Sequence, residues 1–135
     1  MQDILKKAAQ KTRRWATRYA KTNHFPQSLA GLCAIASIRL HAELVKEGVV
    51  AQIAVRNAVN DGHCFVIVDD QVIDVTATQF GKFKAVSILP RSEAIEHRHW
   101  NAKKQFGTAE DVTAYLRKAK WPAHQIKARQ PKPLG

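Results

Sequence analysis

One cysteine occupies a position where a thiol could act as a nucleophile. Cys33 follows Gly31 near the start of a largely apolar segment, which we expect to form a buried helix over residues 28–47. The unpaired N–H groups at the beginning of a helix stabilise a thiolate and lower the pKa of a thiol. Cysteine is also among the most frequently buried residue types, so Cys33 taken alone favours a core residue.

A histidine and an aspartate further along the chain strengthen the functional interpretation. His63 begins a predicted strand after the turn-like segment Asn60-Asp61-Gly62, and Asp74 lies within the next predicted strand. A carboxylate among apolar strand residues costs free energy unless it has a partner. A two-residue hairpin loop at Asp69-Asp70 would put His63 and Asp74 on one face as diagonal neighbours, whereas a three-residue loop would separate them.

Together these residues form a set in which Cys33 is the nucleophile, His63 its base and Asp74 the group that orients the base. Taken separately, each has a simpler interpretation. His63 could be a solvent-facing residue at a strand end, and Asp74 could be a bulge or edge residue. The order of a cysteine on a helix, a histidine on a strand and an acid on the following strand favours the functional set.

The elements that must position this set predict an α+β fold over residues 1–135. We expect a basic helix first, then the buried helix, three or four strands and a helix that a capping box opens. The predicted ranges are 3–21, 28–47, 49–55, 64–68, 72–76 and 83–89, followed by a helix from Thr108 and a basic tail after Trp121-Pro122. This divides the chain into a basic N-terminal helix (1–22), a core that carries the candidate residues (23–90) and a helical, basic C-terminal part (91–135).

The segment 62–80 resembles the papain-like superfamily, particularly its smaller transglutaminase-like and bacterial papain-fold toxin branches. It reproduces a pattern of His, hydrophobic strand, turn, hydrophobic strand, then Asp74-Val75-Thr76 and Gln79-Phe80. The resemblance implies a nucleophile-bearing buried helix packed on a small antiparallel sheet, with extra N- and C-terminal helices. The family also has an upstream glutamine whose amide helps to bind the oxyanion, and Gln27 precedes Cys33 at the matching spacing.

The resemblance implies a cysteine-dependent hydrolase or acyl transferase, acting by peptide or amide hydrolysis, glutamine deamidation or transamidation. The Gly-Leu-Cys-Ala sequence around Cys33 lacks the Cys-Gly-Ser-Cys-Trp motif of papain proteases, so the reaction type stays open. A protein or peptide substrate is expected. The resemblance to bacterial papain-fold toxins also implies a possible partner, an acidic immunity or inhibitor protein that binds the basic chain.

We expect no metal or other cofactor. Cys33, His63, Cys64 and Asp74 could be counted as zinc ligands, but residues 63 and 64 point to opposite faces of a strand. The chain also has no Cys-x-x-Cys pair. Cys64 is therefore predicted to fill the core.

The charge of the chain supports a second class of function. A net charge of +11 favours anionic partners and suits a nucleic-acid-binding or RNA-cleaving module, although a solvated basic surface is the simpler interpretation. Four aromatic residues could stack on bases, namely Trp15, Tyr19, Trp100 and Trp121. His97 and His99, beside Trp100, are expected at the surface. A third alternative is a degenerate papain-like protein that only binds a partner.

The sequence predicts a cytoplasmic protein, or one delivered into the cytoplasm of a target cell. Two cysteines are too few for a disulfide scaffold and indicate thiols in a reducing compartment, with one disulfide possible but not required. No apolar run approaches the length of a membrane span, and the first residues do not have the pattern of a secretion signal.

Overall fold

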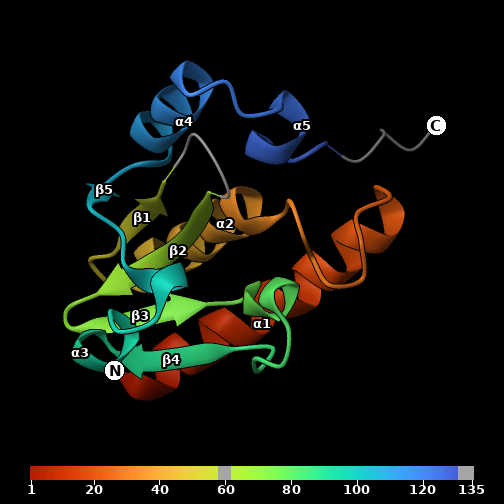
Figure 1. The fold of residues 1–135 in the computed structure, drawn as a ribbon. Helices are drawn as coiled ribbons and strands as arrows, with labels where there is room; N and C mark the ends of the chain where they lie inside the picture. The colour runs from red at the N-terminus through yellow and green to blue at the C-terminus, as the bar shows by residue number, and fades with distance from the viewer. Residues whose placement is uncertain (58–61, 131–135) are drawn as a thin grey trace.

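The computed structural model describes residues 1–57 and 62–130, in which helices pack on a five-stranded antiparallel sheet (Figure 1). The strands stand in the order β4-β3-β2-β1-β5, and their ranges are β1 (Gln52–Arg56), β2 (His63–Val68), β3 (Gln71–Asp74), β4 (Ser87–Pro90) and β5 (Lys104–Phe106). The helices are α1 (Gln2–Thr22), α2 (Cys33–Lys46), α3 (Arg91–Ala94), α4 (Ala109–Lys118) and α5 (Ala123–Ile126), with 3₁₀ turns η1 (Ala77–Phe80) and η2 (Arg98–Trp100). The predicted α+β class is confirmed.

The hairpin between β2 and β3 has the predicted two-residue loop. Val68 pairs with Gln71 across Asp69 and Asp70, and the antiparallel ladder continues as far as Val66 opposite Ile73. Because side chains alternate along a strand, this register sends alternate residues of β2 to the two faces of the sheet.

The two faces of the sheet are covered by different parts of the chain. On one face α1 and α2 pack against Val66, Val68 and Ile73, and Figure 1 shows both helices behind the strands. On the other face the segment 94–102 packs against Phe65, which belongs to a cluster that includes Trp100. Both faces of β2 are therefore buried, and all six of its residues are inaccessible to solvent.

The long buried helix begins later than the sequence predicted. α2 starts at Cys33 rather than at residue 28, because Leu29 and Gly31 have left-handed φ angles of 69° and 85° that no helix can contain. Cys33 is thus the first residue of the helix. The cap predicted at the next long helix is confirmed, since the backbone N–H of Asp111 donates to Thr108 Oγ1 over 3.1 Å.

The C-terminal third contains elements that the sequence did not predict. Strand β5 adds an edge beside β1, and a short helix α3 follows β4. The chain after Trp121-Pro122 is not a frayed tail throughout, because it forms α5 and buries Ile126. Residues 131–135, like Asn60 and Asp61 of the predicted turn, lie outside the described residues. No helix among the described residues is long and apolar enough to cross a membrane.

Candidate active site

Cys33 lies at the beginning of α2 with only 3% of its surface exposed. Its N–H belongs to the first helical turn, where backbone donors have no partner within the helix. Hydrogen bonding from the side chains of Cys64 and His63 lowers the pKa of its thiol. The helix start therefore brings a thiol to the beginning of β2.

His63 is the first residue of β2 and is fully buried. Its Nε2 atom is 2.6 Å from Asp74 Oδ2. Because Nε2 is engaged with Asp74, Nδ1 is the ring nitrogen left to serve a nucleophile, and it also lies near the amide of Gln79. The ring is packed edge-on against Phe80, with 4.7 Å between the ring centres, and lies near Phe65. These contacts fix the orientation of the imidazole.

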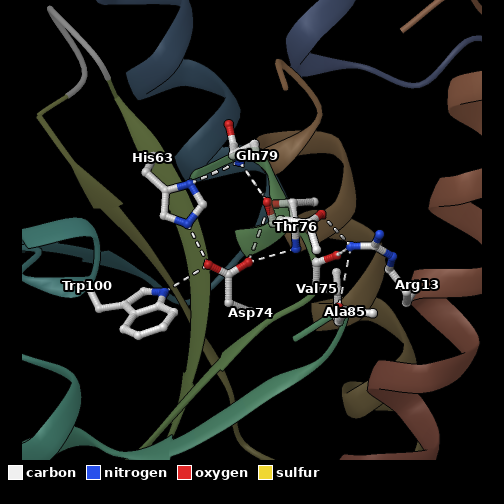
Figure 2. Close-up of polar contacts among 9 residues, drawn as sticks. Arg13, His63, Asp74, Val75, Thr76, Gln79, Ala85 and Trp100 are labelled. Carbon is white, nitrogen blue, oxygen red and sulfur yellow. Dashed lines mark hydrogen bonds and ion pairs between the residues drawn. The ribbon is translucent and has the colours of Figure 1, made fainter. Parts of the chain in front are cut away.

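Asp74 ends β3 and is held by donors on both carboxylate oxygens (Figure 2). Oδ1 accepts the backbone N–H of Thr76 at 2.8 Å and the Thr76 hydroxyl at 3.3 Å. Oδ2 accepts the indole N–H of Trp100 at 2.8 Å, in addition to the contact with His63. A buried carboxylate with this many donors stays ionised and fixed in place.

These contacts set the protonation states of the three groups. Hydrogen bonding from the Cys64 side chain, with a further contribution from His63, lowers the pKa of Cys33 to about 5 against the opposing effect of burial. Burial disfavours the charged imidazole, but the charge and hydrogen bond of Asp74 outweigh it and raise the pKa of His63 to about 10. Burial would raise the pKa of Asp74, yet His63 and Trp100 keep it below its ordinary value. These shifts all favour the charged forms, namely a Cys33 thiolate, a His63 imidazolium and an Asp74 carboxylate.

The loop after Asp74 is braced from two directions. The Gln79 amide Nε2 donates to the Thr76 carbonyl at 3.1 Å and lies 3.5 Å from His63 Nδ1. From α1, Arg13 Nη1 donates to the Val75 carbonyl and to Thr78 Oγ1, both at 2.9 Å (Figure 2). The N-terminal helix therefore supports the loop that holds the acid.

Gln27 is the predicted oxyanion donor, and that role stays a prediction. It is exposed in a turn and lines a cavity of about 390 Å³ with Lys21, Phe25 and other residues, of which Cys33 is not one. The left-handed residues Leu29 and Gly31 change the direction of the chain between Gln27 and Cys33. A prediction from the number of intervening residues alone does not include this change of direction.

Two aromatic residues predicted to be available for stacking on bases are buried instead. Trp100 is 3% exposed and donates to Asp74, and Tyr19 is 9% exposed, with its hydroxyl accepting the Arg129 N–H at 2.7 Å. The expectation that His97 and His99 are surface residues holds only in part. Both are partly buried, and His99 is stacked on Phe80 with 3.7 Å between ring centres. Burial lowers the pKa of His99 to about 4.

Several residues of the site were missed or misassigned from the sequence. Trp100 and Arg13 reach the site from distant segments, and no spacing rule connects them to it, whereas Cys64 directly follows His63. Thr76 and Gln79 were noted only as parts of a pattern, although an Asp-x-Thr sequence after a strand is typical of a side chain that accepts the N–H two residues later. The structure brings Cys33, His63 and Asp74 together, and their catalytic role stays a prediction.

Comparison of the chain with models of known families, with curated proteins and with solved structures gave no match.

Proposed function

We propose that this chain is a cysteine-dependent hydrolase or acyl transferase of the papain-like type, with Cys33 as nucleophile, His63 as acid and base, and Asp74 as orienter. The observation that carries the proposal is a buried His63 held by Asp74 at 2.6 Å, with the Cys33 thiol at the start of α2 close enough for His63 to lower its pKa. A structural histidine could be satisfied by a single acceptor. A buried imidazole placed between a thiol and a carboxylate is what nucleophile activation requires.

The first half-reaction follows from the positions of the protons. The Cys33 thiolate attacks the carbonyl carbon of an amide, and the new S–C bond pushes the carbonyl electrons onto oxygen. The backbone N–H of Cys33, in the first turn of α2, is the candidate donor to that oxyanion. As the C–N bond breaks, His63 gives its Nδ1 proton to the leaving amine, and a thioester on Cys33 remains.

The second half-reaction reverses these roles. Neutral His63 takes a proton from water or from an incoming amine, which attacks the thioester carbon and releases Cys33 as a thiolate. Asp74 keeps Nε2 protonated throughout, so that Nδ1 is always the nitrogen that exchanges the proton. Water gives hydrolysis or deamidation, and an amine gives transamidation.

The burial of the nucleophile supports a narrow acyl group as substrate. Cys33 is 3% exposed and His63 is fully buried. An extended peptide or a glutamine side chain presents a slender carboxamide that could reach such a sulfur. Among substrates with the same leaving group, we therefore expect linear acyl groups to react faster than branched ones.

Acyl transfer from p-nitrophenyl acetate tests the proposal without knowledge of the natural substrate. The wild-type chain should release p-nitrophenol in a burst and carry an acetyl group on Cys33 after an acid quench. Cys33→Ala should abolish the burst, and His63→Ala should reduce it roughly 100-fold or more. Arg14→Met, which changes an exposed cation of α1, is the matched control and should behave as wild type.

Two outcomes would contradict the proposal. Acetylation confined to lysines would remove Cys33 as nucleophile, and an undiminished burst in His63→Ala would remove His63 as its base. Adding glycinamide to the acylated wild type then separates hydrolysis from transfer, because a transferase releases the acetyl group as an amide.

A further inference from the structure

Cys64 lies in the core, as the sequence predicted, and it neighbours the proposed nucleophile there. It is the second residue of β2, on the face that α2 covers, and shares an apolar cluster with Cys33, Val55 and Leu116. The two thiols perturb each other strongly, and hydrogen bonding from Cys64 is the main cause of the lowered pKa of Cys33. Both residues are free cysteines, and Cys64 is fully buried.

The two sulfurs differ in protonation state. The hydrogen bond from Cys64 lowers the pKa of Cys33, whereas the same bond and burial raise the pKa of Cys64 well above its ordinary value. A thiolate is the form that reacts with an oxidant, and a neighbouring thiol is the group that resolves the product. The pair therefore has one attacking sulfur and one resolving sulfur, in contact.

We propose that Cys33 and Cys64 are a site of reversible oxidative modification, at which a small hydroperoxide such as hydrogen peroxide converts the two thiols into an intramolecular disulfide. Formation of the disulfide does not depend on the proposed function. The consequence that it switches off acyl transfer rests on that function, because the nucleophilic sulfur is then in the S–S bond.

The chemistry balances in two steps. The Cys33 thiolate attacks one oxygen of hydrogen peroxide, the O–O bond breaks, and a sulfenic acid and hydroxide form. The Cys64 sulfur then attacks the sulfenic sulfur, an S–S bond forms, and the displaced hydroxide leaves with the Cys64 proton as water. Peroxide is reduced, two thiol sulfurs are oxidised, and an added dithiol reverses the change by thiol–disulfide exchange.

The surroundings favour this product over others. Cys33 is 3% exposed and Cys64 is inaccessible, so neither sulfur can readily reach a second protein molecule. An S–S bond of about 2.05 Å forms between cysteines that already neighbour each other, and these two lie in the same buried cluster. A buried sulfenic acid with a thiol in contact should be resolved before a second peroxide oxidises it further.

Peptide mapping without reductant tests the inference. The native wild-type chain is treated with hydrogen peroxide, free thiols are blocked with N-ethylmaleimide, and the digest is examined by mass spectrometry. We expect a Cys33–Cys64 cross-linked peptide and the loss of about two hydrogens from the whole chain. Dithiothreitol should return both thiols and at least about nine-tenths of any acyl transfer.

Cys64→Ser is the matched variant, because it keeps a small polar group beside Cys33 but cannot form the bond. In it, peroxide should produce a sulfenic acid that dimedone traps, then a sulfinic acid that dithiothreitol does not reverse. Finding sulfinic acid on Cys33 of the wild type with no cross-linked peptide would overturn the inference, as would a disulfide found only between molecules. A cross-link in a chain that performs no acyl transfer would keep this inference and remove the proposed function.

Discussion

The sharpest test of the site is the pH dependence of alkylation at Cys33 and its response to His63→Ala. The hydrogen bonds from Cys64 and His63 lower the pKa of Cys33 to about 5, from an ordinary value of 9.0. Labelling with iodoacetamide follows the fraction of thiolate, so the midpoint of the labelling curve reports this pKa directly.

The expected rates show which part of the curve is informative. At about pH 7 a thiol with a pKa of about 5 is roughly 99% ionised, whereas one at 9.0 is roughly 1% ionised. The intrinsic reactivity of a thiolate falls with its pKa, with a coefficient of about 0.4–0.5, so the gain in thiolate is offset by a loss of roughly 40- to 100-fold. The two effects nearly cancel at about pH 7, but at about pH 6 Cys33 should react roughly ten to twenty times faster than an equally accessible ordinary thiol.

The midpoint is the better observable, because limited access to a buried sulfur slows labelling equally at every pH. We expect a midpoint near the pKa of about 5 in the wild type. In His63→Ala the midpoint should move upward, since burial continues to favour the thiol while one of the two donor groups is lost. Cys64 in the same digest is an internal reference and should stay slow throughout, because its pKa is raised.

His124→Ala, which removes an exposed histidine on α5, is the matched control for this measurement. Circular dichroism of each variant establishes that the fold is retained. A wild-type midpoint at the ordinary value for a thiol, or a midpoint that His63→Ala leaves in place, would refute the thiolate–imidazolium pair.

Two further predictions concern residues that support the acid. Trp100→Phe keeps an aromatic ring but removes the N–H that donates to Asp74 Oδ2. It should destabilise the fold by about 1–3 kcal/mol in chemical denaturation and lower the rate of acyl transfer roughly 10- to 100-fold. An unchanged rate would show that the indole only fills space. Arg13→Met removes the donor to Val75 and Thr78 and should lower the free energy of unfolding by about 1–3 kcal/mol. Arg14→Met on the same helix should change it by less than about 0.5 kcal/mol. Equal effects of the two substitutions would contradict a specific role for Arg13 in supporting the loop.

The sequence predicted the parts of the site that depend on local geometry. The hairpin loop at Asp69-Asp70 follows from turn preferences, and the alternation of side chains along its two strands then places His63 and Asp74 on one face. The sequence also placed Cys33 near the start of a helix, because apolar residues follow it and Gly31 precedes it. These inferences span few residues and follow short-range rules.

The parts that were missed depend on how distant segments meet. Nothing near Trp100 in the sequence indicates that its indole lies on Asp74, because the chain has to pass through β4 and α3 before it returns. The left-handed residues Leu29 and Gly31 between Gln27 and Cys33 were not predicted either, because a simple count of spacing treats the chain path as continuous. Basic residues were also assigned to a surface by type alone, although Arg13 is partly buried and hydrogen-bonded to the loop after Asp74.

The position of His63 at the very start of β2 explains how one imidazole can serve groups on both sides of the sheet. Asp74 is held on the face covered by residues 94–102, where Trp100 contacts it, whereas Cys33 belongs to the helix face, where it contacts Cys64. In the middle of a strand, neighbouring backbone on both sides would separate these two layers. At a strand end, a helix can bring its first residue across to the ring, and the proposed chemistry is therefore located where the sheet stops.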